Sequence, residues 1–409
     1  MGINNIINLL GGLGLFLFGM KYMSDGLNQV AGSKMKSLLE KLTRNRFKGF
    51  LLGVLVTAVI QSSSATTVML MGFLNAGIMD LFQATGVIIG ANIGTTITAV
   101  LIAIDVSVIA PFCIFVGAAV ALFSKKQSQK YIGQIILGFG ILFFGLKYMS
   151  GDSAMGVLKS SEAFQHFITT ANNPILGLLI GIAICSVLQS SSAAIGVLQV
   201  LALQGVMPMN FAIYLIIGIN VGSATPLFLS AIGAKTNAKR AAVIYFIFDF
   251  VGMLIFTPVA MFTPFAKWIT TLSDNGSVQV AAAHIIFKVV TAVFLLPFVK
   301  IVVKLSEKII KSHEHETEFR FVYIDRKLNG NTISTALQLG REVERMASVV
   351  RKNFTLACDG FLNMDTSNER EIKDNEELIN WLNHNISDFM VTVTSQNLSG
   401  AVSEYIGKL

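Results

Sequence analysis

The chain has 409 residues, of which 53% are hydrophobic and only 13% are charged, with a mean hydropathy of +0.66. A soluble domain carries about 25% charged residues, so this composition excludes an ordinary soluble protein and indicates several membrane spans. The net charge of +7 comes from short basic segments beside apolar stretches. Such segments set the orientation of the spans in the membrane, so the charge does not indicate nucleic-acid binding. The three cysteines have no metal-binding spacing, so we expect neither disulfides nor zinc.

The first apolar segment, residues 5–23, lacks the basic start and cleavage site of a signal peptide, so we expect a retained span. The basic residues 25–48 are predicted to form an interfacial amphipathic helix. Residues 49–79 carry no charge, but the polar run 61–67 divides them into two halves of about 12 apolar residues, each too short to span. We expect a re-entrant hairpin of two short helices, and one kinked span is the alternative.

The next span, residues 81–104, is expected to be interrupted at residues 92–96, and residues 106–123 run back. The second half repeats this plan. Its elements are a span at 132–150, a polar connection at 151–173, a hairpin within 174–206, an interrupted span at 211–233, a span at 241–262 and a final span at 281–304.

Three pairs of motifs recur in the same order, and they reveal an internal duplication. Q-S-S-S stands at Gln61–Ser64 and, 128 positions later, at Gln189–Ser192. The same offset relates G-A-N-I-G-T-T from Gly90 to G-I-N-V-G-S-A from Gly218. The third pair is F-G-M-K-Y-M-S at 18–24 and F-G-L-K-Y-M-S at 144–150, at an offset of 126.

Each repeat is predicted to cross the membrane an odd number of times, so the two halves should face opposite ways. One threading places every basic loop in the cytoplasm and the N-terminus outside. Inverted repeats with broken helices are typical of secondary transporters. The expected fold is therefore an all-α polytopic membrane protein with two inverted-topology repeats, each holding a re-entrant helical hairpin and a broken span, plus a small cytoplasmic helical bundle.

The residues after 305 are charged and lack any span. Apolar positions three and four apart, from Ile333 to Ala357 and from Ile372 to Val393, predict two amphipathic helices. We interpret His313–Glu316 as a solvated linker, with metal binding as the alternative. The predicted domains are 1–130 for the first repeat, 131–265 for the second, 266–305 for an extra span and 306–409 for the cytoplasmic helices.

The Q-S-S-S turns favour an ion site near the middle of the membrane. The first N–H groups of the helix that follows each turn have no intrahelical partner and carry partial positive charge, so two converging helix starts can hold an anion without Arg or Lys. Amide and hydroxyl oxygens suit a hard cation such as sodium. Close helix packing through small residues is the alternative for each motif taken alone.

Three further candidates have weaker signals. No G-x-S-x-G sequence surrounds either serine run, so we expect no catalytic residue and no enzyme activity. Asp249 is an acid deep within a predicted span, where it acts either in ion coupling or as a satisfied packing residue. His284, at the start of the last span, is expected to be a packing or interfacial residue.

The paired Q-S-S-S motifs, each followed by an N-I-G-T-type break, resemble the type II sodium-dependent phosphate cotransporters, and the tail resembles a PhoU-like helical domain. The resemblance implies symport of inorganic phosphate with sodium, and a scaffold with a mobile transport domain. The phosphate ligands that it implies are Gln61, Ser62, Ser63, Ser64, Gln189, Ser190, Ser191 and Ser192. The sodium ligands that it implies are Gln61, Ser64, Asn92, Thr95, Thr96, Gln189, Ser192, Asn220, Ser223 and Thr225.

We therefore expect a sodium-coupled importer of inorganic phosphate that works by alternating access, with an elevator-like movement of the hairpin domain. A phosphate-sensing membrane regulator, an exporter and a transporter of another oxyanion are the alternatives. The expected location is the bacterial inner membrane, with the C-terminal region in the cytoplasm. Lipid, phosphate and sodium are the expected partners; a homodimer and a regulatory partner for the C-terminal helices are further expectations.

Overall fold

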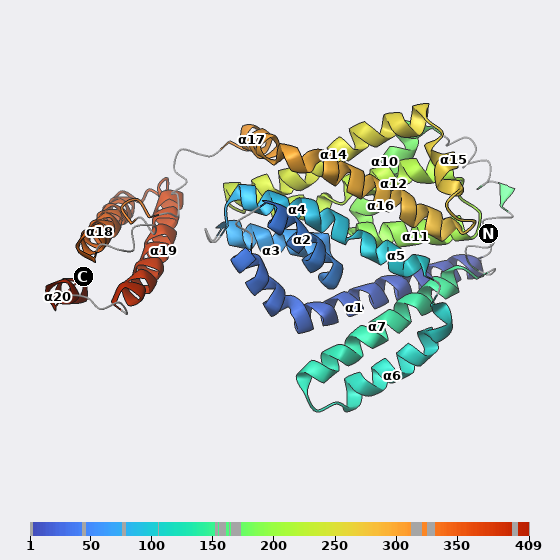
Figure 1. Ribbon diagram of the computed structural model, residues 1–409, viewed down its shortest axis with the longest axis horizontal. Helices are drawn as coiled ribbons and strands as arrows, with labels where there is room; N and C mark the ends of the chain where they lie inside the picture. Colours follow the sequence, from blue (N-terminus) through green and yellow to red (C-terminus); the bar gives the residue numbers. More distant parts are fainter. Residues whose placement is uncertain are drawn as a thin grey trace. The chain divides into compact units, whose positions relative to one another are not determined.

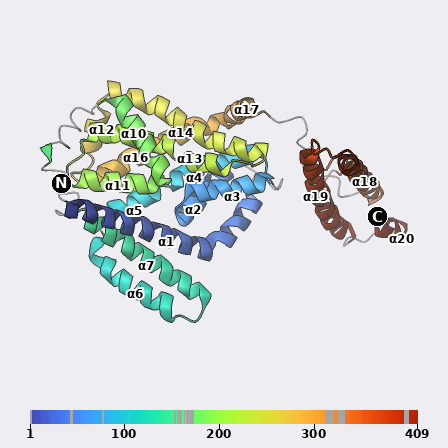
Figure 2. The ribbon, with the colours of Figure 1, turned by 180° about the vertical axis from the view of Figure 1, so that it is seen from behind.

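The computed structural model describes residues 3–42, 46–75, 79–104, 106–151, 154, 161–162, 164, 173–311, 321–324, 332–394 and 400–408. All regular elements in these ranges are helices, as Figures 1 and 2 show from opposite sides. The chain divides into two compact units, residues 1–310 and 311–409.

The first half contains the predicted hairpin turn, because Gln61 and Ser62 separate two short helices. The interruption predicted at residues 92–96 is confined to Thr95, whose φ of −61° and ψ of −27° remain helical and whose N–H still donates to the Ala91 carbonyl oxygen at 3.2 Å. The helices are α1 (Ile3–Leu42), α2 (Arg46–Ile60), α3 (Ser63–Asn75), α4 (Leu81–Gly94), α5 (Thr96–Ala103), η1 (Ser107–Ile109) and α6 (Ala110–Phe123).

The prediction of a separate interfacial helix at 25–48 is wrong, because α1 continues without a break to Leu42. The one glycine at the expected boundary, Gly26, does not end the helix. It instead allows close packing, since a Cβ there would lie 3.1 Å from the carbonyl oxygen of Tyr131.

The second half has its hairpin turn at the equivalent position, Gln189–Ser190. At the predicted second interruption, Ser223 and Ala224 keep helical backbone angles, with φ of −66° and −75°, so the broken span is again nearly continuous. Most of the predicted connection 151–173 lies outside the described residues. The helices are α7 (Gln127–Met149), α10 (Pro174–Leu188), α11 (Ser191–Leu203), α12 (Met209–Gly222), α13 (Thr225–Ser230), α14 (Thr236–Phe262), α15 (Phe265–Thr270), α16 (Gly276–Leu295), η2 (Leu296–Phe298) and α17 (Val299–Ile309).

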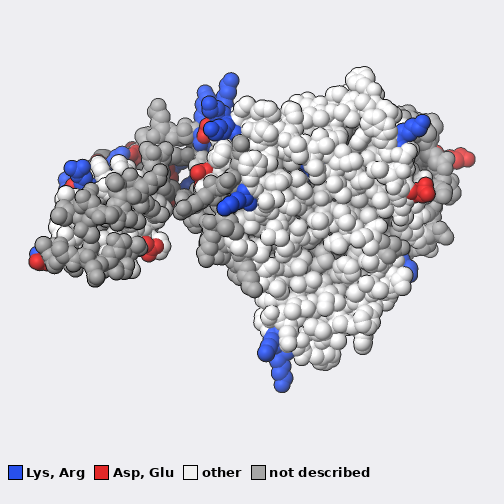
Figure 3. All heavy atoms as spheres, viewed as in Figure 1, with Lys and Arg blue, Asp and Glu red and all other residues white. Residues whose placement is uncertain are grey.

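Among the described residues, six helices are long and apolar enough to cross a membrane. They cover 4–31, 81–103, 127–149, 209–230, 236–262 and 276–309. The span expected at 106–123 is a shorter apolar helix, Ser107–Phe123. Figure 3 shows that the visible face of the first unit is almost free of charged side chains across its middle, while Lys and Arg gather at its margins. The protein is therefore a multi-pass membrane protein.

The duplicated sequence builds the same close helix pair twice. A Cβ on Gly90 of α4 would lie 1.9 Å from the Phe50 carbonyl oxygen of α2, and a Cβ on Gly218 of α12 would lie 2.2 Å from the Leu178 carbonyl oxygen of α10. Glycine is required at both positions because the backbones approach so closely. This contact fixes each broken span against the first helix of its hairpin.

The helices that carry the third repeated motif, α1 and α7, pack against each other in opposite directions. Gly12 of α1 meets Met149 of α7, Gly19 meets Leu142, and Gly26 meets Ile135. The residue numbers rise along one helix as they fall along the other. Equivalent segments of the two halves thus lie antiparallel.

The second unit contains the two predicted amphipathic helices, α18 (Thr332–Asn363) and α19 (Glu369–Thr394), and a third helix, α20 (Gly400–Lys408). Leu339, Leu378 and Leu382 lie at the centre of its core. The run His313–Glu316 lies outside the described residues. The predicted boundary at 305/306 falls inside α17, and Arg240 Nε of the first unit donates to the Ile310 carbonyl oxygen at 3.0 Å, so the first unit ends after Ile310.

Candidate functional site

Each hairpin turn is formed by a glutamine in the left-handed backbone region. Gln61 has a φ of 62° and Gln189 has a φ of 52°, a conformation that is uncommon for a residue with a side chain. Ser24 of α1 supports the first turn by donating to the Ile60 carbonyl oxygen at 2.8 Å. Gln61 is buried whereas Gln189 is exposed, so the duplicated backbone turn has two different surroundings.

The first serine of each Q-S-S-S motif is a helix N-cap. Ser62 Oγ accepts a hydrogen bond from the Ala65 N–H at 3.1 Å, and Ser190 Oγ accepts one from the Ala193 N–H at 3.2 Å. A serine hydroxyl that accepts in this way still has its own proton to donate. The two caps therefore fix the helix starts and leave a hydroxyl donor at each of them.

The two Q-S-S-S motifs are joined through Thr98 of α5. Thr98 Oγ1 donates to Gln61 Oε1 at 2.7 Å and accepts from Ser192 Oγ at 3.4 Å. All three residues are buried. Two turns that lie 128 residues apart in sequence therefore meet across a single threonine, which the sequence analysis did not select.

The third position of the first motif leads to a second network. Ser63 Oγ lies 2.9 Å from the Tyr245 hydroxyl of α14. Ser223, at the second break, lies 3.3 Å from the same hydroxyl and 3.1 Å from Asp249 Oδ2. The first hairpin, the second break and α14 thus share one chain of hydrogen bonds.

The network ends in a buried ion pair. Lys288 Nζ of α16 lies 2.5 Å from Asp249 Oδ1, and the two side chains are 1% and 0% exposed. Asp249 therefore has a charged partner, as expected for an acid inside a membrane protein. Lys288 is absent from the predicted site residues, although it is the one charged residue between Asp274 and Lys300. Lys288 contacts Asn92 and Asp249, so the expectation that two helix starts hold an anion without Arg or Lys stays a prediction.

The asparagines of the two breaks are held in the same way. Asn92 Nδ2 donates to the Ile88 carbonyl oxygen at 3.1 Å, and Asn220 Nδ2 donates to the Ile216 carbonyl oxygen at 2.8 Å. Their Oδ1 atoms face α16: Lys288 Nζ donates to Asn92 Oδ1 at 2.7 Å. His284 Nε2 lies 3.2 Å from Asn220 Oδ1, so Nε2 carries the proton because an amide oxygen only accepts.

His284 is 1% exposed, so its interfacial interpretation is wrong. It faces a residue of the duplicated motif and lies one helical turn before Lys288 on α16.

The remaining predicted residues have other partners or positions. Thr95 Oγ1 donates to the Ala91 carbonyl oxygen at 3.1 Å, and Thr96 Oγ1 donates to that of Ile93 at 2.8 Å. Thr225 Oγ1 lies 2.9 Å from Ser186 Oγ, outside both networks. Ser191 is buried and Ser64 is half-buried in the first turns of α11 and α3.

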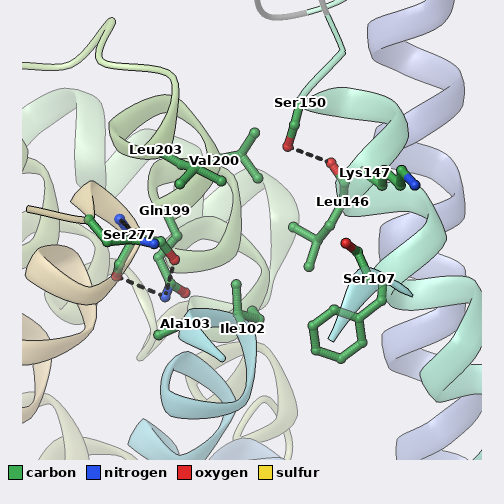
Figure 4. A pocket seen from close by; sticks show the side chains of 12 residues that line it. Ile102, Ala103, Ser107, Leu146, Lys147, Ser150, Gln199, Val200, Leu203 and Ser277 are labelled. Carbon is green, nitrogen blue, oxygen red and sulfur yellow. Dashed lines mark hydrogen bonds between the residues drawn. The ribbon is translucent and has the colours of Figure 1, made fainter. Parts of the chain in front are cut away.

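A cavity of about 190 Å³ lies beside these networks, between α5, α7, α11 and the start of α16. Figure 4 shows Gln199 and Ser277 on one wall and Leu146, Lys147 and Ser150 on the opposite wall. Gln199 Nε2 donates to the Ala99 carbonyl oxygen at 2.9 Å, while its Oε1 has no hydrogen-bond partner among the described residues. None of the predicted ligands lines the cavity, but Gln199 is two helical turns beyond Ser192 on α11.

The side-chain oxygens of the two networks suit a hard cation. They belong to hydroxyls, amides and one carboxylate, which are oxygen ligands for a cation such as sodium. Among the described residues, no group of three His, Cys, Asp or Glu side chains could hold a transition metal. The hydroxyl protons and free N–H groups at the helix starts suit an anion.

Comparisons with known proteins agree with this chemistry. A sequence model of the family described as Na+/Pi-cotransporter matches residues 15–151 and 156–274. The uncharacterized protein YqeW of Bacillus subtilis is 28% identical over 298 residues, which is 72% of this chain and 95% of that protein. No solved structure matches the chain.

Two further relatives carry functional names. The Escherichia coli K12 protein named "Putative inorganic phosphate export protein YjbB" is 26% identical over 355 residues, which is 85% of this chain and 65% of that protein. The human sodium-dependent phosphate transport protein 2B is 30% identical over 196 residues, which is 44% of this chain and 27% of that protein.

Proposed function

Because the chain belongs to the Na+/Pi-cotransporter family, we propose that it imports inorganic phosphate together with sodium. The observation that carries this proposal is the meeting of the two Q-S-S-S turns, Gln61–Thr98–Ser192, inside the membrane unit. In this proposal, the two capped helix starts, α3 and α11, belong to one site. Sodium dependence is supported by the names of the animal relatives.

Phosphate binds between the helix starts of α3 and α11 in this proposal. The hydroxyl protons of Ser62 and Ser190 and the free N–H groups that follow them donate to phosphate oxygens. A phosphate with two negative charges is then held mostly by dipoles. Sodium ions bound to neighbouring oxygens, such as those of Gln61, Ser64 and Ser192, offset that charge.

Transport follows from inversion of the two halves. We place the N-terminus outside and the C-terminal unit in the cytoplasm of a bacterial inner membrane, as the basic loops indicate. The antiparallel packing of α1 on α7 supports two inverted repeats, because the same segment then runs in both directions. Elevator-like movement of the hairpins relative to α1 and α7 would expose the site to each side in turn.

The decisive experiment is uptake of radiolabelled phosphate into proteoliposomes, with an inward sodium gradient and a matched potassium control. We expect uptake only with sodium, and no competition by unlabelled sulfate. Sodium-independent uptake, or none from protein shown to be folded and inserted, would reject the proposal. Reversing the gradients tests export, which the name of the E. coli relative favours: phosphate that leaves loaded vesicles but never accumulates would establish that direction.

Two variants at Ser190 test the assigned site. Ser190→Ala removes both the cap and the hydroxyl, so we expect loss of uptake and about 1 kcal/mol less stability. Ser190→Asp keeps a cap acceptor for the Ala193 N–H but places a negative charge beside the anion. It should stay near wild-type stability and also lose uptake. Normal uptake by Ser190→Asp would remove Ser190 from the phosphate site, and Ser62 variants repeat the test in the first half.

A further inference from the structure

Helix α16 lies outside the duplicated motifs, yet it contacts the same asparagine of each half. Lys288 meets Asn92 and His284 meets Asn220, and the two side chains are four residues apart on one face of the helix. The internal repeat therefore presents two equivalent amide oxygens, and α16 supplies a different side chain to each of them.

The side-chain oxygens around Lys288 have the arrangement of a cation site. Asp249 Oδ1 and Asn92 Oδ1 converge on Nζ at 2.5 and 2.7 Å. Ser223 holds the other carboxylate oxygen, Oδ2, at 3.1 Å. The rings of Phe248 and Phe287 also lie near Nζ, with centroids at 5.4 and 5.9 Å, where their faces favour a cation. Carboxylate and amide oxygens are the kinds of ligand that a hard cation takes.

We infer that Asn92 and Asp249 form a sodium-type cation site that Lys288 fills with a tethered ammonium, so that this site contributes no exchangeable sodium to transport. This inference rests on the proposed function for its role in coupling, although the binding site itself does not. The ammonium neutralises Asp249 in a place where an unpaired carboxylate would be very costly. At the equivalent position of the second half, His284 meets Asn220, and no acidic side chain is among the contacts of its ring nitrogens in the described part of the chain.

Removal of the ammonium should therefore open the site to sodium. In Lys288→Ala, the carboxylate of Asp249 is left buried without its partner, and the vacated volume adjoins two oxygens that already point into it. Sodium in solution can replace the missing charge. In the double variant with Asp249→Asn and Lys288→Ala the site is neutral, so this recruitment should be lost.

The test is thermal unfolding of the purified full-length protein in sodium chloride or potassium chloride, without phosphate. We expect Lys288→Ala to gain a sodium-specific rise in Tm of about 2 °C for each tenfold increase in sodium above its Kd. The double variant should show the wild-type sodium response. Lys300→Ala, which removes an exposed lysine of α17, is the matched control and should also respond as wild type.

Several outcomes would overturn the inference. One is a Lys288→Ala protein with the wild-type sodium response, and another is an equal gain in the double variant. A Lys288→Ala protein that unfolds equally in both salts, while the double variant is stable, would show that sodium does not enter. The unfolding test contains no phosphate, so its result does not depend on transport. If the wild-type protein fails to transport phosphate, the proposed function is rejected, but the sodium response of Lys288→Ala still tests the cation site.

Discussion

At both hairpin turns, the residue in the left-handed conformation is glutamine, where glycine would adopt the same backbone at lower cost. Such a conformation costs on the order of 1–3 kcal/mol for a residue with a side chain. At Gln61 the side chain has a defined task, because its Oε1 accepts from Thr98 while its Nε2 donates to the Ala58 carbonyl oxygen. We infer that glutamine is kept at this strained position because its amide group makes both hydrogen bonds.

Two substitutions at Gln61 separate backbone strain from side-chain chemistry. Gln61→Gly removes the amide and relieves the strain, whereas Gln61→Ala removes the amide and keeps the strain. We expect the Gly variant to be about 1 kcal/mol more stable than the Ala variant, measured by thermal unfolding, and both to lose sodium-driven phosphate uptake. If Gln61→Gly transports like the wild type, the turn matters for its shape and Gln61 is not an ion ligand.

At the scale of helices, each broken span is fixed to its hairpin by glycine contacts. At Gly90 there is no room for a side chain. A Cβ would lie 1.9 Å from the Phe50 carbonyl oxygen, so α2 and α4 would have to move apart. We expect Gly90→Ala to lower the free energy of unfolding by about 3 kcal/mol. Gly72→Ala is the control, because a Cβ there meets nothing within 4 Å and should stabilise α3 by about 0.5–1 kcal/mol. Thermal unfolding of both variants checks the contact, and equal effects would contradict it.

The hairpin turns could be predicted because their sequence signal is local. A run of polar residues within an uncharged segment cannot continue a membrane helix cheaply, and its exact repetition marked both turns. The ion pair could not be predicted in the same way, since Asp249 and Lys288 are 39 residues apart and on separate helices. Their meeting depends on how α14 and α16 pack. Thr98 was missed for the same reason, because its partners Gln61 and Ser192 come from different halves of the chain.

Composition led to one wrong prediction, the separate helix at 25–48, and gave no signal for one helix, α20. The dense Lys and Arg residues after Asp25 suggested a new interfacial helix, but nothing in residues 24–26 stops the helix, and α1 continues. The short helix α20 carries too few apolar residues to show a period of its own. Val402 and Ile406 are buried against the core of the second unit, so α20 takes its place from packing.

At the scale of the whole molecule, the two units raise the question of whether the second is an output domain. A phosphate sensor would need residues 311–409 for its effect, whereas a transporter holds its ion site within the first unit. Every contact of the two networks lies between residues 24 and 288. The hydrogen bond from Arg240 to the Ile310 carbonyl oxygen shows where a truncation must stop, because a cut at 305 would remove part of α17.

We therefore predict that a chain ending at residue 311 folds and transports phosphate. Its sodium-driven uptake into proteoliposomes should stay within about threefold of the full-length rate, since a change of that size corresponds to less than 1 kcal/mol in the barrier. A chain ending at residue 305 is the matched control and should be less stable, because it lacks Ser306 of α17, which is fully buried. If the 311-residue chain folds, with an unchanged Tm for the membrane unit, but moves no phosphate, the second unit takes part in transport. In that case the regulator hypothesis gains support, and phosphate-dependent changes in α18 and α19 become the next observation to seek.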